Sequence, residues 1–110
     1  MAFYMWQGSY TTEAIKAMVD KPQDRMPAGK ALVESAGGTL HHLFFCMGSD
    51  DVVAIAEAPD DATMAAVSFA LGASGAFSAG RTTKLVTSTE AMAAMQSAQG
   101  ILKGYTPATG

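Results

Sequence analysis

The sequence predicts an α+β domain in which strands and helices follow the order strand, helix, strand, strand, helix, strand. Three observations support this prediction. The 110 residues are enough for about one domain. Hydrophobic residues make up 49% of the chain and charged residues only 15%, a composition that excludes a disordered chain. Four short apolar segments are typical of strands, and segments with apolar residues at helical spacing separate them.

The chain opens with a predicted strand and a helix. Ala2–Tyr10 is rich in aromatic residues, and both alternating sets of positions are apolar at its start. Thr11 and Thr12 are candidate N-caps for the helix that follows. The Lys21–Pro22 step interrupts this helix, because proline disfavours the helical conformation in the residue before it.

A second helical piece completes the first crossover. It begins at about Arg25, with Asp24 as its expected cap and Pro27 in its first turn. Gly37–Gly38 ends it, since glycine readily adopts the left-handed conformation that follows many helices. Thr39–Met47 is then predicted to be the second strand, again without a polar face.

The second half of the chain repeats this order. Gly48–Asp51 has the length of a hairpin turn, and Val52–Ala58 is a short apolar strand. Asp60 is the expected cap of a helix that carries one apolar stripe. Arg81–Thr87 is the predicted fourth strand, and the segment before it is expected to be loosened by Gly72, Gly75 and Gly80.

The C-terminal region is predicted to add a short helix and an irregular tail. Thr87 and Glu90 fit a capping box, and Met92 and Met95 are expected to face inward. The tail runs from Gly100 to Gly110. We therefore expect a domain over residues 1–90, and a helix and tail over residues 91–110 that pack on the same domain or on a partner chain.

One hairpin and two crossovers connect the predicted strands. They give a four-stranded antiparallel sheet with helices on one face, which is the split βαβ or ferredoxin-like arrangement. Because the strands are apolar on both faces, a monomer would expose a large apolar surface. We therefore expect a homodimer or a higher homo-oligomer through the sheet face, with a small-molecule cavity between the two sheets.

Six short motifs follow one another along the chain: Ser9-Tyr10-Thr11, Glu34-Ser35-Ala36-Gly37-Gly38, Gly48 with Asp51, Pro59-Asp60, Ser74-Gly75 and Arg81-Thr82-Thr83. In their order and spacing they resemble the GYD-domain family of small bacterial proteins, over roughly residues 2–90. The resemblance implies a ferredoxin-like domain in the dimeric α+β barrel style. That architecture is similar to small monooxygenases, haem-degrading proteins and muconolactone-isomerase-like enzymes, but the resemblance implies no catalytic residue.

The turn motif departs from the family at one position. Gly48 and Asp51 match the family's glycine and aspartate, whereas Asp50 stands where tyrosine is usual. Aspartate serves well as a turn residue, so the hairpin is expected to form. Any contribution of that tyrosine to a ligand would be lost in this chain.

Four residues are candidates for lining a pocket. Trp6 and Tyr10 share a face of the first strand, where they suit a flat or aromatic ligand or the dimer interface itself. His42 is expected to share a face with Cys46, with His41 on the opposite face, so that the two histidines do not bind one metal. Cys46 lies about 13 Å from His42 along the strand and is expected to be an inert, packed thiol.

Charge and cysteine content exclude several classes of partner. The formal net charge is −3, and the seven Lys and Arg residues are scattered, so we expect no nucleic-acid partner. No basic and then apolar leader opens the chain, and the uncharged stretch Ala62–Gly80 is interrupted by Gly and Ser, which predicts a cytoplasmic protein without a membrane span. No cofactor and no metal site is predicted, although these patterns leave a haem or a metal ion open.

Three hypotheses for function remain at this point, and the catalytic residues are unknown. The first is a small-molecule-binding homo-oligomer with its pocket at the interface between sheets. The second is a small barrel-type enzyme, such as an oxygenase or isomerase, that uses His42 with Tyr10 or Trp6. The third is a structural module whose apolar sheet only mediates assembly.

Overall fold

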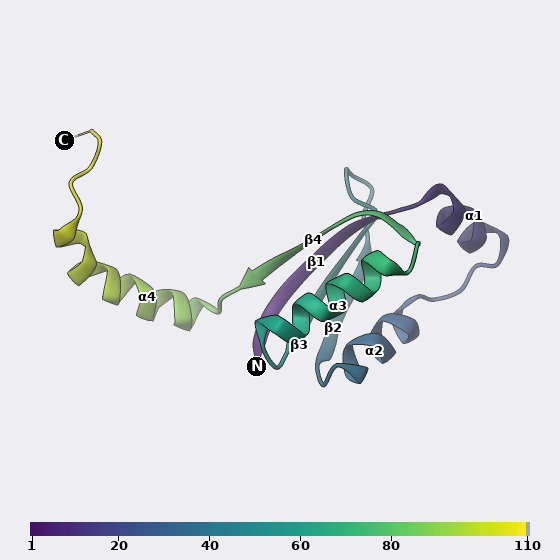
Figure 1. Ribbon diagram of the computed structural model, residues 1–110, viewed down its shortest axis with the longest axis horizontal. Helices are drawn as coiled ribbons and strands as arrows, with labels where there is room; N and C mark the ends of the chain where they lie inside the picture. The colour runs from purple at the N-terminus through teal and green to yellow at the C-terminus, as the bar shows by residue number, and fades with distance from the viewer. Residues whose placement is uncertain (110) are drawn as a thin grey trace.

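The computed structural model describes residues 1–109, and Gly110, the end of the predicted tail, lies outside the described residues. The elements follow the predicted order (Figure 1). They are β1 (Ala2–Tyr10), α1 (Thr12–Asp20), α2 (Met26–Ser35), β2 (Thr39–Phe45), β3 (Val52–Ala58), α3 (Asp61–Ala73), β4 (Phe77–Leu85), α4 (Ser88–Ile101) and the 3-10 helix η1 (Leu102–Gly104).

The four strands form one antiparallel sheet in the order β2-β3-β1-β4. Helix α2 packs on β2, and α3 packs on β4 with further contacts to β1 and β3. Both helices therefore cover the same face of the sheet, while α1 lies beyond its end (Figure 1). The predicted fold class is confirmed: this is the ferredoxin-like βαββαβ arrangement.

Three helices begin where the sequence predicts a cap. The Thr11 hydroxyl accepts a hydrogen bond from the backbone N–H of the first turn of α1, and the Asp60 carboxylate does the same for α3. At α4, Thr87 and Glu90 form both bonds of the predicted capping box. These caps satisfy N–H groups that have no partner within the helix, which is why they fix where each helix begins.

The boundaries of several elements differ from the prediction. Strand β2 ends at Phe45 and not at Met47. The N-cap of α2 is Arg25, which makes no side-chain hydrogen bond to the helix. Asp24 precedes it by one residue, and its carboxylate accepts from the N–H of Met26. Strand β4 starts at Phe77, so Gly80 lies inside the strand and does not loosen a loop.

Gly80 has a packing function that explains its place in β4. It is paired with Gly8 across the sheet, and a Cβ at Gly80 would approach the Trp6 ring to 2.8 Å. A Cβ at Gly8 would also collide with this ring. The two glycines therefore leave the space in which the Trp6 indole lies flat over β1 and β4.

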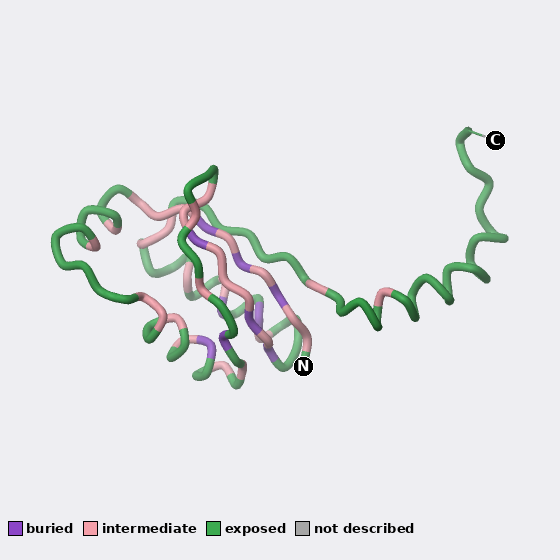
Figure 2. The backbone as a smooth tube through the Cα atoms, turned by 180° about the vertical axis from the view of Figure 1, so that it is seen from behind, coloured by how far each residue is buried: buried purple, intermediate pink, exposed green. Residues whose placement is uncertain are grey.

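The buried core lies between the sheet and its helical layer. Tyr4 and Trp6 of β1 pack there against Met64 and Val67 of α3, and Figure 2 shows the buried residues concentrated along the strands. The opposite face of the sheet, which we call the open face, carries Phe3, Met5, Val53, Ile55 and Phe44. No element within residues 1–109 covers it.

Helix α4 extends away from the rest of the chain (Figures 1 and 2). Met92 and Met95 are 54% and 68% exposed, so the prediction that they face inward is wrong for this chain. The Cα radius of gyration is 17.8 Å, against about 13 Å for a compact domain of this length. Residues 91–109 thus do not pack on their own domain. Within residues 1–109, no helix has both the length and the apolar character needed to cross a bilayer.

Candidate functional site

A cavity of about 230 Å³ lies between the sheet, α2 and α3. Its floor is formed by residues of β1, β2 and β3, and its sides by residues of α2, α3 and the segment that precedes β4. The lining residues are Tyr4, Trp6, Tyr10, Arg25, Ala28, Gly29, Leu32, Val33, Leu40, Leu43, Val52, Ala54, Ala56, Met64, Val67, Leu71, Ser74, Ala76 and Phe77. The site is therefore on the helix side of the sheet, not on the open face.

Small residues at central positions leave this space. Ala54, in the middle of β3, lies opposite Trp6 on one side and Leu43 on the other, yet it is only half-buried. Gly29 of α2 faces Leu40, and a Cβ there would approach the Leu40 side chain to 3.1 Å. Gly29 therefore allows α2 to approach β2 closely. Ala54 presents only a methyl group to the cavity floor and leaves part of the space between the sheet and the helices open.

Stacked aromatic rings form one wall of the cavity. The rings of Tyr10 and Phe77 stack with centroids 4.6 Å apart, and Trp6 meets Phe77 edge-on at 4.8 Å. Phe45 stacks on Tyr10 at 5.9 Å. This confirms that Trp6 and Tyr10 share a face. Phe77 is not among the expected pocket residues, because the sequence pattern predicts a loop at this position.

Two polar groups reach the cavity at the same end. Tyr10 is half-buried, and burial raises the pKa of its hydroxyl, while the positive charge of Arg25 lowers it and the charge of Asp51 raises it. Arg25 is the charged residue of the described lining. The sequence predicts Arg25 only as the start of a helix, because sequence alone does not reveal that this end of α2 lines the same cavity as Tyr10.

Asp51 of the turn motif holds the end of β1 in place. Its carboxylate Oδ2 accepts from the backbone N–H of Tyr10 at 2.9 Å. Its own N–H donates to the carbonyl of Gly8 at 2.9 Å, and its carbonyl accepts from Cys46 at 2.7 Å. Asp51 therefore fixes the β2–β3 hairpin against β1 and positions the Tyr10 ring, which is more than the turn-forming task predicted for it.

The other turn residues make fewer contacts. Asp50, at the position where the family usually has tyrosine, forms an ion pair with Arg81 of β4. A Cβ added at Gly48 would meet nothing within 4 Å. Neither residue lines the cavity.

The two histidines lie on the same face, because β2 contains a bulge. Leu40 pairs with Ala56 and His42 with Ile55, which leaves His41 as the extra residue. The prediction that His41 and His42 point to opposite faces is therefore wrong. His41 Nε2 lies 2.8 Å from Glu57 Oε1, and its ring stacks on Phe3 of the open face.

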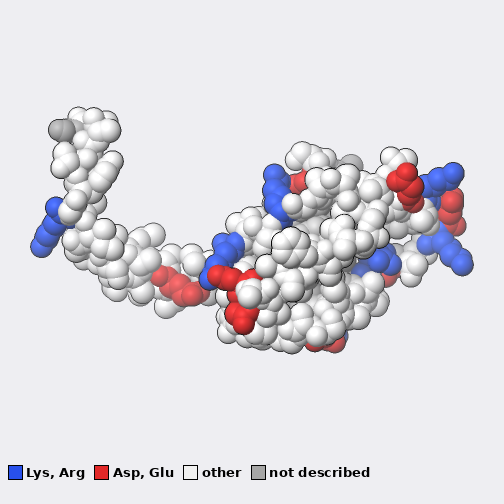
Figure 3. Space-filling model, in the orientation of Figure 1, with Lys and Arg blue, Asp and Glu red and all other residues white. Residues whose placement is uncertain are grey.

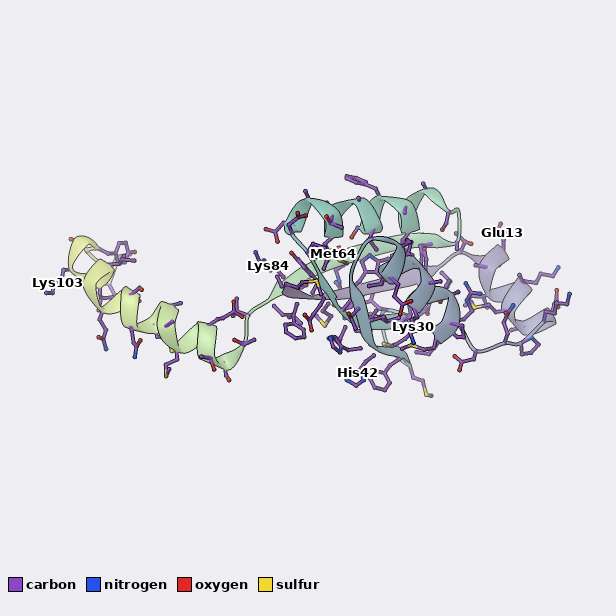
Figure 4. The ribbon with its side chains drawn as sticks, turned by 90° about the horizontal axis from the view of Figure 1, so that it is seen from below. Glu13, Lys30, His42, Met64, Lys84 and Lys103 are labelled. Atoms are coloured by element: carbon purple, nitrogen blue, oxygen red, sulfur yellow. The ribbon has the colours of Figure 1, made fainter. Side chains whose placement is uncertain are left out.

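The four predicted pocket residues do not come together. His42 stacks on Phe44 on the open face, and Figure 4 shows it on the side of the sheet away from Met64 and α3. Trp6 and Tyr10 are on the helix side. Cys46 is a free, half-buried thiol beyond the end of β2. Within one chain, His42 is thus separated by the sheet from the aromatic residues expected to act with it.

No group of three or more His, Cys, Asp or Glu side chains within residues 1–109 is arranged to hold a metal ion. On the face seen in Figure 3, charged side chains gather toward the ends of the domain, with acidic and basic groups interspersed, and the middle is largely uncharged.

Comparison with known proteins defines the relationships of the chain. Among solved structures, the chain is similar to MtbAldR, with a TM-score of 0.54 and 15% identity over 78% of this chain. It spans about half of MtbAldR, 52% of that chain. An uncharacterized NIPSNAP domain protein from Burkholderia xenovorans gives a TM-score of 0.46 at 15% identity, with 80% and 95% of the two chains covered.

The likeness to MtbAldR supports the ferredoxin-like fold and nothing finer. No curated protein matches the sequence significantly. The family model for the GYD domain matches residues 4–95, which includes the sheet, α1 to α3 and the first half of α4. This chain therefore belongs to the GYD domain family.

Proposed function

We propose that this chain is a homo-oligomeric binding protein that holds a small apolar molecule in the cavity between the sheet, α2 and α3. The observation that carries the proposal is an apolar cavity of about 230 Å³ in a core this small. Protein interiors are close-packed and contain few voids larger than a water molecule. The cavity opens to solvent beside the exposed residues Ala28 and Ser74. An accessible apolar space of this size next to stacked aromatic rings favours a ligand.

The volume limits the size of the ligand. An apolar cavity of about 150 Å³ is enough to hold benzene, whereas sites for drug-sized molecules span roughly 300–1,000 Å³. A cavity of about 230 Å³ thus suits a molecule of one or two rings. The proposed site lies on the helix side of each sheet, whereas the sequence pattern predicts a cavity between two sheets.

Assembly through the open face is the second part of the proposal. Apolar side chains of β1 and β3, such as Met5 and Ile55, lie opposite each other there. A contiguous apolar surface on a soluble chain marks an interaction site. Because the two faces of the sheet are then used separately, pairing through the open face would leave the cavity accessible.

A cavity-filling variant tests the binding site. We expect indole at ten times its Kd to raise the free energy of unfolding of the wild-type chain by about 1.4 kcal/mol. For a domain of this size, this corresponds to a rise of several degrees in the melting temperature. In Ala54→Leu the added side chain occupies the cavity floor, so the shift should disappear.

The matched control is Ala66→Leu, which adds the same side chain at an exposed position of α3 outside the cavity lining. It should keep the full response to indole, measured by differential scanning fluorimetry. An equal shift in both variants, or no shift in the wild-type chain at saturating indole, would refute the proposal.

A further inference from the structure

Two donor groups without protein partners meet the apolar cavity. The Arg25 side chain forms no ion pair within the part of the chain that the structure describes, unlike Lys30, Arg81 and Lys84, which each pair with a carboxylate. The Tyr10 hydroxyl likewise has no hydrogen-bond partner among residues 1–109, although its backbone N–H is bonded to Asp51. A guanidinium and a phenol at the same site can both donate to one acceptor.

The two groups act at the same end of the cavity. Helix α2 packs on β2 and is joined to it by a short turn, so the start of α2 lies toward the end of β2, where Phe45 stacks on Tyr10. The positive charge of Arg25 accordingly opposes the rise that burial causes in the pKa of the Tyr10 hydroxyl. The aromatic wall formed by Tyr10 and Phe77 continues from this point into the apolar interior. A ligand that fills the cavity therefore meets hydrocarbon along its body and the two donors at one end.

The charge balance of the lining selects for an anion. Arg25 is a permanent cation, and no Asp or Glu of the described residues lines the cavity. Asp51 does not line the cavity, although its charge also acts on Tyr10. Its carboxylate already accepts a hydrogen bond from the N–H of Tyr10. One cation beside an apolar space matches one negative charge, since burying a second, uncompensated charge is costly.

From these observations we infer that the ligand is a small monocarboxylate with an aromatic or aliphatic body, whose carboxylate is bound by Arg25 and the Tyr10 hydroxyl. The inference rests on the proposed function, because it assigns the ligand class of the same cavity. Arginine binds a carboxylate with two parallel hydrogen bonds, which gives orientation as well as affinity. A phosphomonoester carries about two charges and would leave one of them without a partner.

A matched pair of probes tests this inference by isothermal titration calorimetry. We use 3-phenylpropanoate and its neutral amide, 3-phenylpropanamide, which have nearly the same shape. The wild-type chain should bind the acid about tenfold more tightly than the amide. Arg25→Gln should lose about ten- to hundredfold in affinity for the acid, because hydrogen bonds to charged groups are the strong ones, and should bind the amide as the wild type does.

Two further variants separate recognition from folding. Tyr10→Phe keeps the ring that stacks on Phe77 and removes only the hydroxyl, so it should weaken binding of the acid more than binding of the amide. Lys30→Gln removes another cation from α2 (labelled in Figure 4) that does not line the cavity, and it should bind both probes as the wild type does.

The possible outcomes distinguish the two proposals. Equal affinity of the wild-type chain for acid and amide, or an Arg25→Gln variant that keeps the affinity for the acid, would overturn the carboxylate inference. If indole binds while 3-phenylpropanoate does not, the inference fails and the cavity remains a binding site for neutral molecules. If neither indole nor either probe binds, the proposed function fails together with the inference.

Discussion

At the scale of single residues, a few side chains determine the shape of the cavity. Asp51 connects the hairpin to the end of β1 through the N–H of Tyr10, so a residue of the turn motif positions a residue of the cavity wall. Gly8 and Gly80 determine where the Trp6 indole lies, because neither glycine has a side chain that would collide with it. Each of these effects depends on a contact between elements far apart in the sequence.

Replacement of Asp51 should destabilise the fold. Asp51→Ala leaves the half-buried N–H of Tyr10 without an acceptor, and we expect the free energy of unfolding to fall by about 1–3 kcal/mol. Asp51→Asn keeps an acceptor oxygen and should cost less. Urea denaturation measures both values. Asp20→Ala, at an exposed position at the end of α1, should stay within about 0.5 kcal/mol of the wild type. A wild-type stability for Asp51→Ala would contradict this account.

The Tyr4 hydroxyl should titrate unusually late. It donates to Asp61 Oδ1 at 2.5 Å, and this hydrogen bond is the main cause that raises the pKa of Tyr4 to about 12, from an ordinary value of 10.0. Because the folded pKa is the higher one, the contribution to stability is complete below pH 10 and is lost as the pH rises toward 12. Near-ultraviolet absorbance of tyrosinate follows this ionisation.

Two variants identify the late transition. Tyr4→Phe should remove it, and Asp61→Asn should move it to lower pH, because the acceptor charge is gone. Tyr105→Phe, at an exposed residue near the C-terminus, should leave it in place. The same hydrogen bond lowers the pKa of Asp61, so that its contribution is present above the ordinary aspartate pKa and is lost as the pH falls through the folded value. A late transition that survives Tyr4→Phe would show that another group causes it.

At the scale of elements, α4 differs from the helices that cover the sheet. It has 14 residues, and the capping box at Thr87 and Glu90 satisfies its first turn. Its side chains are almost all exposed, including Met92, Met95 and Ile101, so packing within the chain contributes little to it. Isolated helices of about this length are marginal in water, and the cap therefore matters more here than in α3, which the core also holds.

Removal of this cap should weaken α4 specifically. Thr87→Ala loses the hydrogen bond to the N–H of Glu90, at a cost of about 1 kcal/mol to the helix. We expect a loss of helical signal in far-ultraviolet circular dichroism and non-helical backbone chemical shifts confined to residues 88–101. Thr89→Ala removes the same side chain two residues further on, outside the capping box, and should keep the signal. Equal spectra for the two variants would mean that contacts other than the cap hold α4.

At the scale of the whole molecule, two apolar surfaces lack a partner among residues 1–109. One is the open face of the sheet, and the other is α4 with η1, where Leu102 is 71% exposed. Because α4 and η1 extend away from the sheet, the molecule is elongated, with principal extents of 59 × 33 × 22 Å. Both surfaces suit contact with a second copy of the chain, as does the low content of charged residues. Of the two expectations for residues 91–110, packing on the same domain or on a partner chain, only the second stays a prediction.

A charge in the centre of the open face should separate the subunits. Ile55 lies opposite Met5 in the sheet, and Ile55→Lys would bury a lysine in the interface between two sheets. Size-exclusion chromatography with light scattering should give at least twice the mass of one chain for the wild type and the mass of one chain for the variant. Ala66→Lys, on the outer side of α3, should keep the wild-type mass. A monomeric wild type at high concentration would refute assembly through this face.

The sequence by itself determined the features that depend on neighbouring residues. Apolar patterning gave the number and order of the strands, caps such as Asp60 and Thr87 marked where helices begin, and short motifs identified the family. These signals are local, because a cap bonds to its own first turn and a strand pattern repeats every two residues. They also led to the fold class, since few ways exist to connect four such strands.

Only the tertiary structure decided which side chains meet. The bulge at His41 depends on the register between β2 and β3, and it reverses the face that alternation predicts for one histidine. Gly29 and Ala54 are remote in sequence and line the same cavity, which no local pattern encodes. Arg25 lines the same cavity as Tyr10, and Met92 lies away from the core. Both positions result from long-range packing, because the energy of a contact depends on both of its partners.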